Sequence, residues 1–428
     1  MIFSDKIDKK EYENFVLHNK YKSHFMQSIG WGEFQETVNN RKAYYTGVYK
    51  DNELVATCML LEKKLPLGYS YMYVPRGPVL NFEDTETLDF LINNLKAFAK
   101  KKKAIYIKFD PDIIIKRENY KEEPVKIDMD TDKLFKHLTE DLKLKHLGFT
   151  KNFETAQPRF TYRIDLSSSE DEIYSRFSKT AQKTAKKAEE SGCIYVKTDA
   201  SHIEEFYSVM LDTENRKDFV GHNKEYYKNL FNYFKDLKLY LAYIKPQYLI
   251  NLYQDKIDNI ENKLNKLDPK LSKNQGKINE YHKQISFHKK NLDIYEDALK
   301  RYGEKILLNA YIIMHYGNKA WALYGGSKTY LQNTSSNIGL YKYMIMDAKA
   351  SGLEIYDNFG AVAKDSDNDY LLGLNNFKKS FGGDFIEFMG EFDLIINKPL
   401  YFLFNKLVPI YRKIINKKIK KQNKKRSD

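Results

Sequence analysis

Five basic residues in the segment 170–191 have the spacing of a binding surface. They are Arg176, Lys179, Lys183, Lys186 and Lys187. Four of them follow at intervals of three, four and four residues, which places them on one face of a helix with Lys186 beside them. Such a stripe can neutralise several phosphates and bind a nucleic acid, with an affinity that falls steeply with salt. A solvated lysine face is the alternative.

Several familiar catalytic motifs are missing from the sequence. It contains no Gly-x-Ser-x-Gly elbow, no histidine-rich metal cluster and no glycine-rich phosphate loop. The basic, glycine-alternating loop with which acetyltransferases bind coenzyme A is also missing, and the nearest glycine pairs are Gly325-Gly326 and Gly382-Gly383. We therefore expect no metal and no cofactor, and an acyl donor other than coenzyme A.

The first third of the chain alternates strands and helices. A hairpin is predicted around Asp51-Asn52, and a helix over 84–101, where apolar residues recur at helical period. The predicted strands are 43–50, 53–61, 69–75 and 104–109. This order is typical of an N-acyltransferase-like α/β unit.

A second unit repeats the pattern from about Phe160. Predicted helices cover 170–191, 200–217, 223–236 and 333–351, and predicted strands cover 193–198, 238–244, 306–315, 319–325 and 353–357. We therefore predict an α/β fold of two tandem acetyltransferase-like domains, residues 1–155 and residues 156–245 with 304–398, enclosing a cleft.

Residues 246–303 interrupt the second unit with two heptad strips. Apolar residues recur at alternating intervals of three and four from Ile250 to Leu271 and again from Ile278 to Leu299, with a Pro269 to Gly276 turn between them. This spacing predicts an antiparallel coiled-coil arm. His288 falls on the apolar seam, where packing is a simpler role for it than ligand binding.

Composition indicates a basic intracellular protein. The 428 residues carry a net charge of +13, which favours polyanionic partners, although a lysine-rich genome would have the same effect. Two lone cysteines, Cys58 and Cys193, fit a reducing compartment. The amino terminus has no signal-peptide pattern, and no apolar run is long enough to span a bilayer.

The tail, residues 399–428, combines aromatic and aliphatic residues with a lysine cluster. This pattern fits attachment to an anionic membrane surface. A docked helix with a charged end is the alternative, and both can hold together.

Eight segments in order resemble the FemABX peptidyltransferase family, and they span nearly the whole chain. They are Phe25–Trp31, Val74–Val79, Ile107–Pro111, Met210–Arg216, Tyr324–Ser327, Tyr356–Gly360, Phe377–Gly383 and Ile396–Pro399. The predicted arm also falls where FemA-like members carry theirs. The resemblance implies two acetyltransferase-like halves and transfer of Gly, Ala or Ser from aminoacyl-tRNA to a lipid-linked peptidoglycan precursor or its growing bridge.

The resemblance also implies roles for two catalytic residues. Aminolysis of an ester requires a neutral amine, although amines are mostly protonated at neutral pH. Asp110 matches the family's acidic residue and would accept or orient that proton; a turn cap is its alternative. Lys378 matches the lysine that would stabilise the oxyanion, with neighbouring Lys379 a competing assignment and a surface position the alternative.

Further residues would bind the substrates. Arg216 is the best candidate for the precursor's diphosphate, because a guanidinium forks onto phosphate oxygens. Phe377 would pack on the stem peptide or the adenosine, and Tyr324 and Tyr226 would bond to sugar or peptide unless they are core residues. The family's lysine after the Gln-Ser-x-x-Trp segment has no counterpart within 32–36, which leaves Arg41 and Lys42 unassigned.

Because the family has a basic run in the same place, the resemblance assigns the stripe of Arg176, Lys179, Lys183, Lys186 and Lys187 to tRNA. The expected partners are aminoacyl-tRNA, a lipid-linked precursor, the inner membrane surface and, through dimerisation, a second Fem protein. Two other interpretations stay open. One is an acyl-CoA-dependent N-acyltransferase, which the missing coenzyme A loop disfavours. The other is an RNA-binding or scaffolding coiled-coil protein with inactive halves, which would still bind tRNA after Asp110 and Lys378 were replaced.

Overall fold

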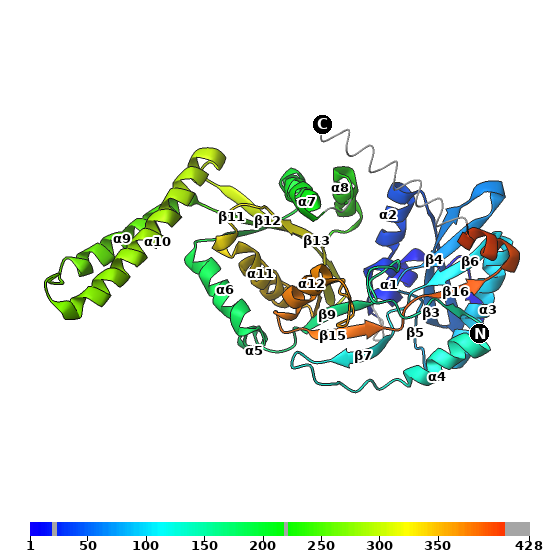
Figure 1. Ribbon diagram of the computed structural model, residues 1–428. Coiled ribbons are helices and arrows are strands. Elements are labelled where there is room, and N and C mark those ends of the chain that lie inside the picture. Colours follow the sequence, from blue (N-terminus) through cyan, green and yellow to red (C-terminus); the bar gives the residue numbers. More distant parts are fainter. Residues whose placement is uncertain (19–23, 218–220, 407–428) are drawn as a thin grey trace.

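Two eight-stranded sheets and a helical arm make up the molecule (Figure 1). The computed structural model describes residues 1–18, 24–217 and 221–406. The fold-class prediction is confirmed, since helices pack on two mixed sheets and a long helix pair projects from the second one. No helix among the described residues is both long and apolar enough to cross a bilayer.

The first sheet has the strand order β1-β2-β3-β4-β6-β16-β8, and β5 pairs with β3. Its strands are β1 (Ile2–Ser4), β2 (Lys42–Lys50), β3 (Glu53–Lys64), β4 (Ser70–Val74), β5 (Val79–Leu80), β6 (Ala104–Phe109), β8 (Lys145–His146) and β16 (Phe392–Ile395). Asp51 and Asn52 join β2 to β3 with φ values of 51° and 67°, as a two-residue hairpin turn requires. The predicted hairpin is confirmed.

The second sheet has the order β10-β11-β12-β13-β14-β9-β15-β7. Its strands are β7 (Ile114–Glu118), β9 (Phe160–Asp165), β10 (Ile194–Thr198), β11 (Leu237–Ile244), β12 (Ile306–Tyr316), β13 (Lys319–Ser327), β14 (Ile355–Asp357) and β15 (Asp384–Phe388). Each sheet contains one parallel pair, β4–β6 and β13–β14, whose strands are connected through α3 and α11. The two halves therefore repeat one motif.

Each sheet also takes a strand from the other part of the chain. β7 follows β6 along the chain but pairs with β15 in the second sheet. β16 lies near the carboxyl terminus but pairs with β6 and β8 in the first sheet. These two exchanges join the halves through backbone hydrogen bonds.

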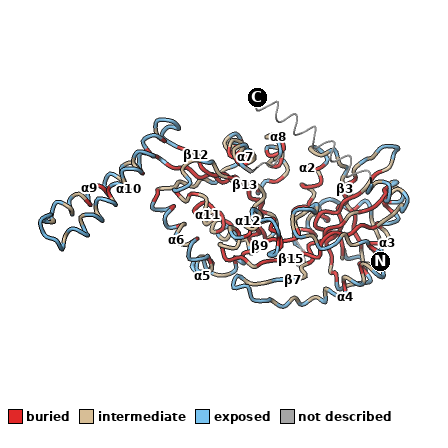
Figure 2. The backbone as a smooth tube through the Cα atoms, in the orientation of Figure 1, coloured by how far each residue is buried: buried red, intermediate tan, exposed pale blue. Residues whose placement is uncertain are grey.

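Helices cover both sheets. They are α1 (Lys9–His18), α2 (Ile29–Asn39), α3 (Thr85–Lys101), α4 (Thr131–Lys136), α5 (Glu170–Ser175), α6 (Lys179–Glu190), α7 (Ile203–Lys217), α8 (Lys224–Tyr233), α9 (Pro246–Leu264), α10 (Ser272–Tyr302), α11 (Ser336–Ala350) and α12 (Asp369–Lys379). The largest core cluster combines residues of both halves, among them Tyr12, Phe34, Phe206 and Trp321. The halves share this cluster, and each sheet has a further cluster of its own. Figure 2 shows where the buried residues lie along the chain.

The continuous helix predicted over 170–191 is wrong, because the chain forms α5 and α6 with a break between them. Ser178 takes a non-helical conformation, with φ −56° and ψ 149°, and caps α6, its hydroxyl accepting from the Ala181 N–H at 3.1 Å. A serine in this position starts a new helix because its side chain satisfies one of the first free N–H groups.

α9 and α10 form the predicted arm (Figure 1). Ile257, Ile260 and Ile285 pack along its seam, and Leu249 and Tyr295 anchor its base against the second sheet. His288 lies on the seam beside Tyr253 with its ring centroid 5.7 Å away, and burial lowers its pKa. The 31 residues of α10 span about 46 Å.

Candidate functional site

Asp110 follows β6 and its side chain is 3% exposed. Its carboxylate accepts hydrogen bonds from the Tyr73 hydroxyl and from the Arg76 backbone N–H, both at 2.7 Å. Burial raises the pKa of Asp110 to about 7, although the Arg76 charge and the Tyr73 hydrogen bond oppose the shift. A carboxyl group with this pKa can exchange a proton near neutral pH.

Lys378 lies in the last turn of α12 and is 7% exposed. Its Nζ donates to the carbonyl oxygen of Phe359, at 2.8 Å, and to that of Gly360. Burial lowers the pKa of Lys378 to about 7, although Asp357 opposes the shift. An ammonium group has three N–H donors, so these two carbonyls orient it and leave one donor.

The two neighbours of Lys378 named from the sequence face other surroundings. Lys379 forms an ion pair with Glu122 at 2.9 Å, and its side chain is 40% exposed. Phe377 is half-buried and packs edge-on against Tyr341, with ring centroids 5.0 Å apart. Of these three residues, Lys378 is the one that donates hydrogen bonds to the loop at 359–360.

A buried ionic network connects the surroundings of Asp110 and Lys378. Asp112 lies two residues after Asp110, and its Oδ1 accepts from Arg163 Nη2 at 3.0 Å. Arg163, on β9, donates through Nε to Asp357 Oδ2 at 2.7 Å. Asp357 ends β14, directly before the loop whose carbonyls hold Lys378. The network therefore joins both halves of the molecule.

The network is almost completely removed from solvent. Asp112 and Asp357 are 3% and 2% exposed, and the Arg163 side chain is 11% exposed. Thr161 adds a hydroxyl donor to Asp357 Oδ1 at 2.5 Å, and the Phe359 N–H donates to the same oxygen at 2.9 Å. Burial alone would lower the pKa of Arg163, but the Asp112 and Asp357 carboxylates outweigh it and raise that pKa, so Arg163 carries its charge.

Tyr226 and Tyr324 meet at the junction of α8 and β13. Their hydroxyl oxygens are 3.1 Å apart, and the His222 ring stacks on Tyr226 at 3.6 Å. The Arg41 guanidinium lies 6.0 Å from the ring centroid of Tyr73, the residue bonded to Asp110, and its charge also acts on Tyr226. Arg41 thus links the tyrosine pair to the surroundings of Asp110.

Arg216 lies near the end of α7 and is exposed. Its Nη2 donates to the Ser327 carbonyl at 3.2 Å, which holds it beside the end of β13. Gly325 and Gly326 allow this close packing, because a Cβ atom on Gly326 would lie 2.1 Å from the Thr213 hydroxyl. The guanidinium retains further donors for an anionic ligand.

The basic stripe is shorter than the sequence predicts. Lys179, Lys183, Lys186 and Lys187 are exposed on α6, and none of the four forms an ion pair with another described residue. Arg176 instead lies at the end of α5, where it donates to the Ser168 hydroxyl. The helix break therefore separates Arg176 from the lysines.

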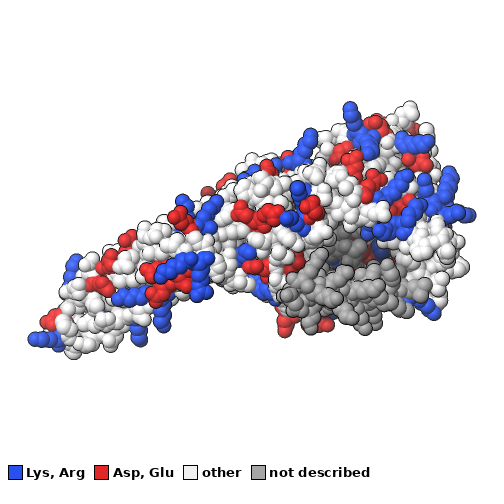
Figure 3. Space-filling model, turned by 90° about the horizontal axis from the view of Figure 1, so that it is seen from above, with Lys and Arg blue, Asp and Glu red and all other residues white. Residues whose placement is uncertain are grey.

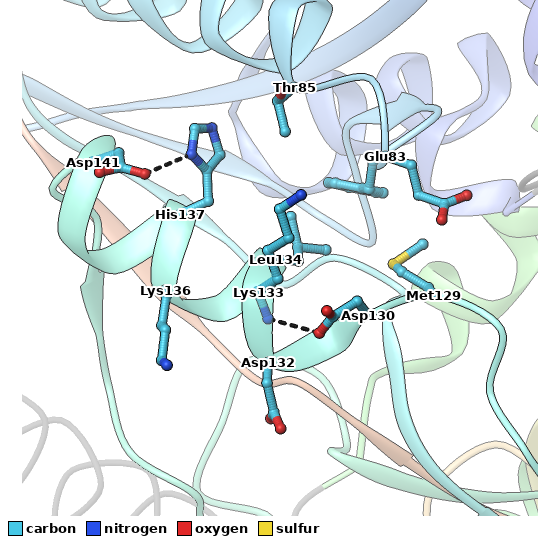
Figure 4. A pocket seen from close by; sticks show the side chains of 11 residues that line it. Glu83, Thr85, Met129, Asp130, Asp132, Lys133, Leu134, Lys136, His137 and Asp141 are labelled. Atoms are coloured by element: carbon cyan, nitrogen blue, oxygen red, sulfur yellow. Dashed lines mark hydrogen bonds and ion pairs between the residues drawn. The ribbon is translucent and has the colours of Figure 1, made fainter.

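A separate cavity of about 750 Å³ lies between α3 and α4 (Figure 4). At its edge the His137 ring contacts the carboxylates of Asp89, at 2.6 Å from Nε2, and of Asp141, at 2.8 Å from Nδ1. None of the predicted site residues lines this cavity. Within the described ranges no group of three or more His, Cys, Asp or Glu side chains is arranged to hold a metal ion.

Sequence reasoning missed most of the polar network. Asp112 follows Asp110 in an Asp-Pro-Asp segment, and Asp357 lies in a segment that carried the resemblance, so both signals were present. Nothing local pointed to Arg163, because only the pairing of β9 with β14 brings it to these carboxylates. Tyr73 was missed because only the pairing of β4 with β6 brings it to Asp110.

The comparisons identify the class of protein. Residues 7–408 match the FemAB family, and the chain belongs to it. It is an aminoacyl-tRNA-dependent aminoacyltransferase of peptidoglycan bridge synthesis.

Particular relatives are moderately similar over their whole lengths. The lipid II:glycine glycyltransferase of Staphylococcus aureus strain MRSA252 is 28% identical over 433 residues, which cover 97% of this chain and 99% of the relative. A second Staphylococcus aureus lipid II:glycine glycyltransferase is 29% identical over 437 residues with the same coverage. The crystal structure of FemX has a TM-score of 0.75 at 26% identity, and covers 94% of this chain and 99% of that chain.

Proposed function

We propose that this protein transfers glycine from glycyl-tRNA to the stem peptide of a lipid-linked peptidoglycan precursor. The choice of glycine and of a lipid-linked acceptor follows the names of the staphylococcal relatives. The observation that supports the chemistry most directly is the pair Asp110 and Lys378. Both groups are buried and have a pKa of about 7. Asp110 lies two residues before Asp112, and Lys378 bonds to the loop that follows Asp357, so each flanks one carboxylate of the Arg163 network.

The reaction is the aminolysis of an ester. The acceptor's amine nitrogen forms a bond to the aminoacyl carbonyl carbon, the carbonyl oxygen becomes negatively charged, and the ester bond to the tRNA ribose then breaks. The amine loses a proton, and the ribose hydroxyl gains one. Two large substrates must be held together for this step, so positioning supplies much of the rate enhancement.

Asp110 would accept or orient the proton of the amine. Its two oxygens are held by donors from Tyr73 and Arg76, so the carboxylate is fixed before substrates bind. A carboxylate retains lone pairs beyond these two contacts. With a pKa of about 7, it is a stronger base than an exposed aspartate.

Lys378 would stabilise the oxyanion with its remaining N–H. The Phe359 and Gly360 carbonyls prevent the side chain from rotating away. A fixed cation in a buried site stabilises a developing negative charge more than the same cation in water. Lys379 is the weaker candidate, because Glu122 already neutralises it at the surface.

Other predicted residues would bind the substrates. Arg216 would contact the diphosphate of the precursor, and Tyr226 and Tyr324 would bond to its sugar or peptide. Phe377 would pack on peptide or adenosine only if its present contact with Tyr341 opened. The lysines of α6 would contact tRNA phosphates. We place the reaction at the inner membrane surface, because the proposed acceptor is lipid-linked, and a dimer with a related protein remains a prediction.

The test combines purified protein, lipid-linked precursor and radiolabelled glycyl-, alanyl- or seryl-tRNA. We expect label to move to the precursor from glycyl-tRNA and expect Lys378→Met to abolish transfer. Lys379→Met, one residue away and paired with Glu122, is the matched control and should retain activity. Absence of transfer from every aminoacyl-tRNA would refute the proposal. Transfer from acyl-CoA, or tRNA binding without transfer, would support the two alternatives instead.

A further inference from the structure

A helix at residues 398–406 closes one end of the first sheet. Asn397 caps it, with its Oδ1 accepting from the Leu400 N–H at 3.1 Å. Tyr401 packs on Tyr106 with ring centroids 5.4 Å apart, and its hydroxyl donates to Asp393 Oδ2 at 2.7 Å. The docked-helix interpretation of this part of the tail is therefore correct, while residues 407–428 lie outside the described residues.

The outer side of this helix is apolar and exposed. Phe402 and Leu403 are 64% and 52% exposed. The turn between β3 and β4 lies beside the helix, because Leu65 and Tyr69 belong to the same cluster as Leu400 and Phe404. Leu67 at the apex of this turn is 93% exposed. Two elements therefore present large apolar side chains to solvent side by side.

The conformation of Leu67 is unusual for its residue type. Its φ is 62°, in the left-handed region that glycine and asparagine occupy more readily than leucine. An apolar side chain that is neither buried nor conformationally favoured contributes nothing evident to the fold. Such an outlier points to a function at the surface.

Lysines surround these apolar side chains. Lys64 begins the turn and pairs with Glu62 at 2.7 Å. The Lys103 backbone carbonyl accepts from the Ser70 N–H of β4 at 3.2 Å, and the Lys145 ammonium lies 5.2 Å from the Tyr401 ring centroid. Lys398 and Lys406 occupy the two ends of the helix and are exposed. Neither the turn at 65–69 nor the helix at 398–406 contains an acidic residue. Figure 3 shows Lys and Arg side chains gathered at this end of the molecule.

The chain continues from the helix with the same charge. Residues 407–428 contain nine Lys and Arg residues and one Asp. A cluster of this size beside apolar side chains is the pattern that anionic lipid headgroups attract. A protein partner would need matching acidic groups, whereas a bilayer accepts apolar tips and surrounding cations together.

We propose that Leu67, Phe402 and Leu403, with the surrounding lysines, form a docking face for an anionic lipid bilayer. The value of this face to catalysis rests on the proposed function, in which the acceptor is lipid-linked. β6 begins beside the docking face at Ala104 and ends before Asp110. These six residues of extended chain span about 20 Å, so the docking face and Asp110 lie near opposite ends of one strand.

The test measures binding of the full chain to vesicles of phosphatidylcholine, with and without phosphatidylglycerol. The test variant is Leu67→Asn with Phe402→Gln. Asparagine suits the left-handed φ, and glutamine suits a helix, so the fold should persist. The control is Phe287→Gln on α10, where the phenylalanine is 59% exposed but lies on the distant arm.

We expect the parent and the control to bind vesicles containing phosphatidylglycerol, and the double variant to bind at least about tenfold more weakly. Equal binding by the double variant, or no preference for the anionic lipid, would overturn the proposal. A changed oligomeric state in the variant would assign the face to a second copy of the chain instead. Unchanged thermal unfolding of the variant verifies the fold.

A transfer assay with two acceptors then separates this proposal from the proposed function. The double variant should lose transfer to lipid-linked precursor in vesicles but retain transfer to a water-soluble precursor lacking the lipid. If the parent protein transfers label to neither acceptor, the proposed function is refuted, and the result of the vesicle-binding test is unaffected. Equal loss with both acceptors would contradict the docking face.

Discussion

Replacing Arg163 by methionine removes the cation that lies between two buried carboxylates. Asp112 and Asp357 contact Arg163 at 3.0 and 2.7 Å and are almost unexposed. Removing one partner of a buried ion pair costs roughly 3–5 kcal/mol, because the charge left behind is uncompensated. Thr161 and the Phe359 N–H still donate to Asp357, which places our expectation at the lower end, about 3 kcal/mol.

The loss should depend on pH. Without Arg163, two buried carboxylates lose their compensating cation, and burial in general raises the folded-state pKa of an uncompensated carboxyl group. A protein loses free energy of unfolding as the pH rises through the raised folded-state pKa of such a group. The free energy of unfolding of Arg163→Met should therefore approach that of the parent as the pH falls toward 5. Adding Asp112→Asn removes one of the orphaned charges and should recover part of the loss at pH 7.

Urea unfolding followed by tryptophan fluorescence measures these differences, since Trp321 is completely buried in the core shared by both halves. Transfer should also fall in Arg163→Met, because Asp357 positions the carbonyls that orient Lys378. Arg163→Lys keeps the charge but cannot donate to both carboxylates as the guanidinium does. Its free energy of unfolding and its transfer activity should therefore lie between those of the parent and of Arg163→Met. If the free energy of unfolding of Arg163→Met lies within about 0.5 kcal/mol of the parent's at pH 7, the structural role of the network is refuted.

The remaining predictions concern Asp110, Lys378 and the basic stripe. Single-turnover transfer should follow a bell-shaped pH profile centred near 7, because Asp110 acts ionised and Lys378 acts protonated and both pKa values are about 7. A profile flat from pH 6 to 8 would contradict those roles. The free energy of unfolding of Asp110→Asn should rise relative to that of the parent between about pH 4 and 7, by at most about 4 kcal/mol, because the parent must ionise a buried carboxyl group over this range. Urea midpoints measured across this range test the effect. A difference between variant and parent that does not change with pH would exclude it. The double variant Lys183→Glu with Lys187→Glu should weaken tRNA binding in filter assays and reduce the salt dependence of that binding. The control Lys283→Glu, on the arm, should change neither. Equal effects of the two changes would mean that tRNA binding responds to net charge and not to the α6 lysines.

The sequence by itself determined the features that depend on neighbours along the chain. Heptad spacing places Ile257 and Ile285 on one helical face wherever the rest of the chain lies, so it predicted the arm. The hairpin at Asp51-Asn52 is likewise a property of two adjacent residues and their strands. The α6 lysines were also correctly placed on one face, but the helix break at Ser178 was overlooked because a serine within a polar segment signals a cap only weakly.

The tertiary structure alone decided which side chains surround the candidate catalytic groups. Lys378 and Lys379 are adjacent and chemically identical, and only the packing of α12 buries the first and pairs the second with Glu122. Asp110 acquires a pKa of about 7 because the fold encloses it, not because of its neighbours in the chain. Arg163 meets both carboxylates only because β9 pairs with β14 while β6 delivers Asp112 from the other half. Burial and long-range strand pairing cannot be read from local periodicity, since they depend on contacts between residues far apart in the sequence.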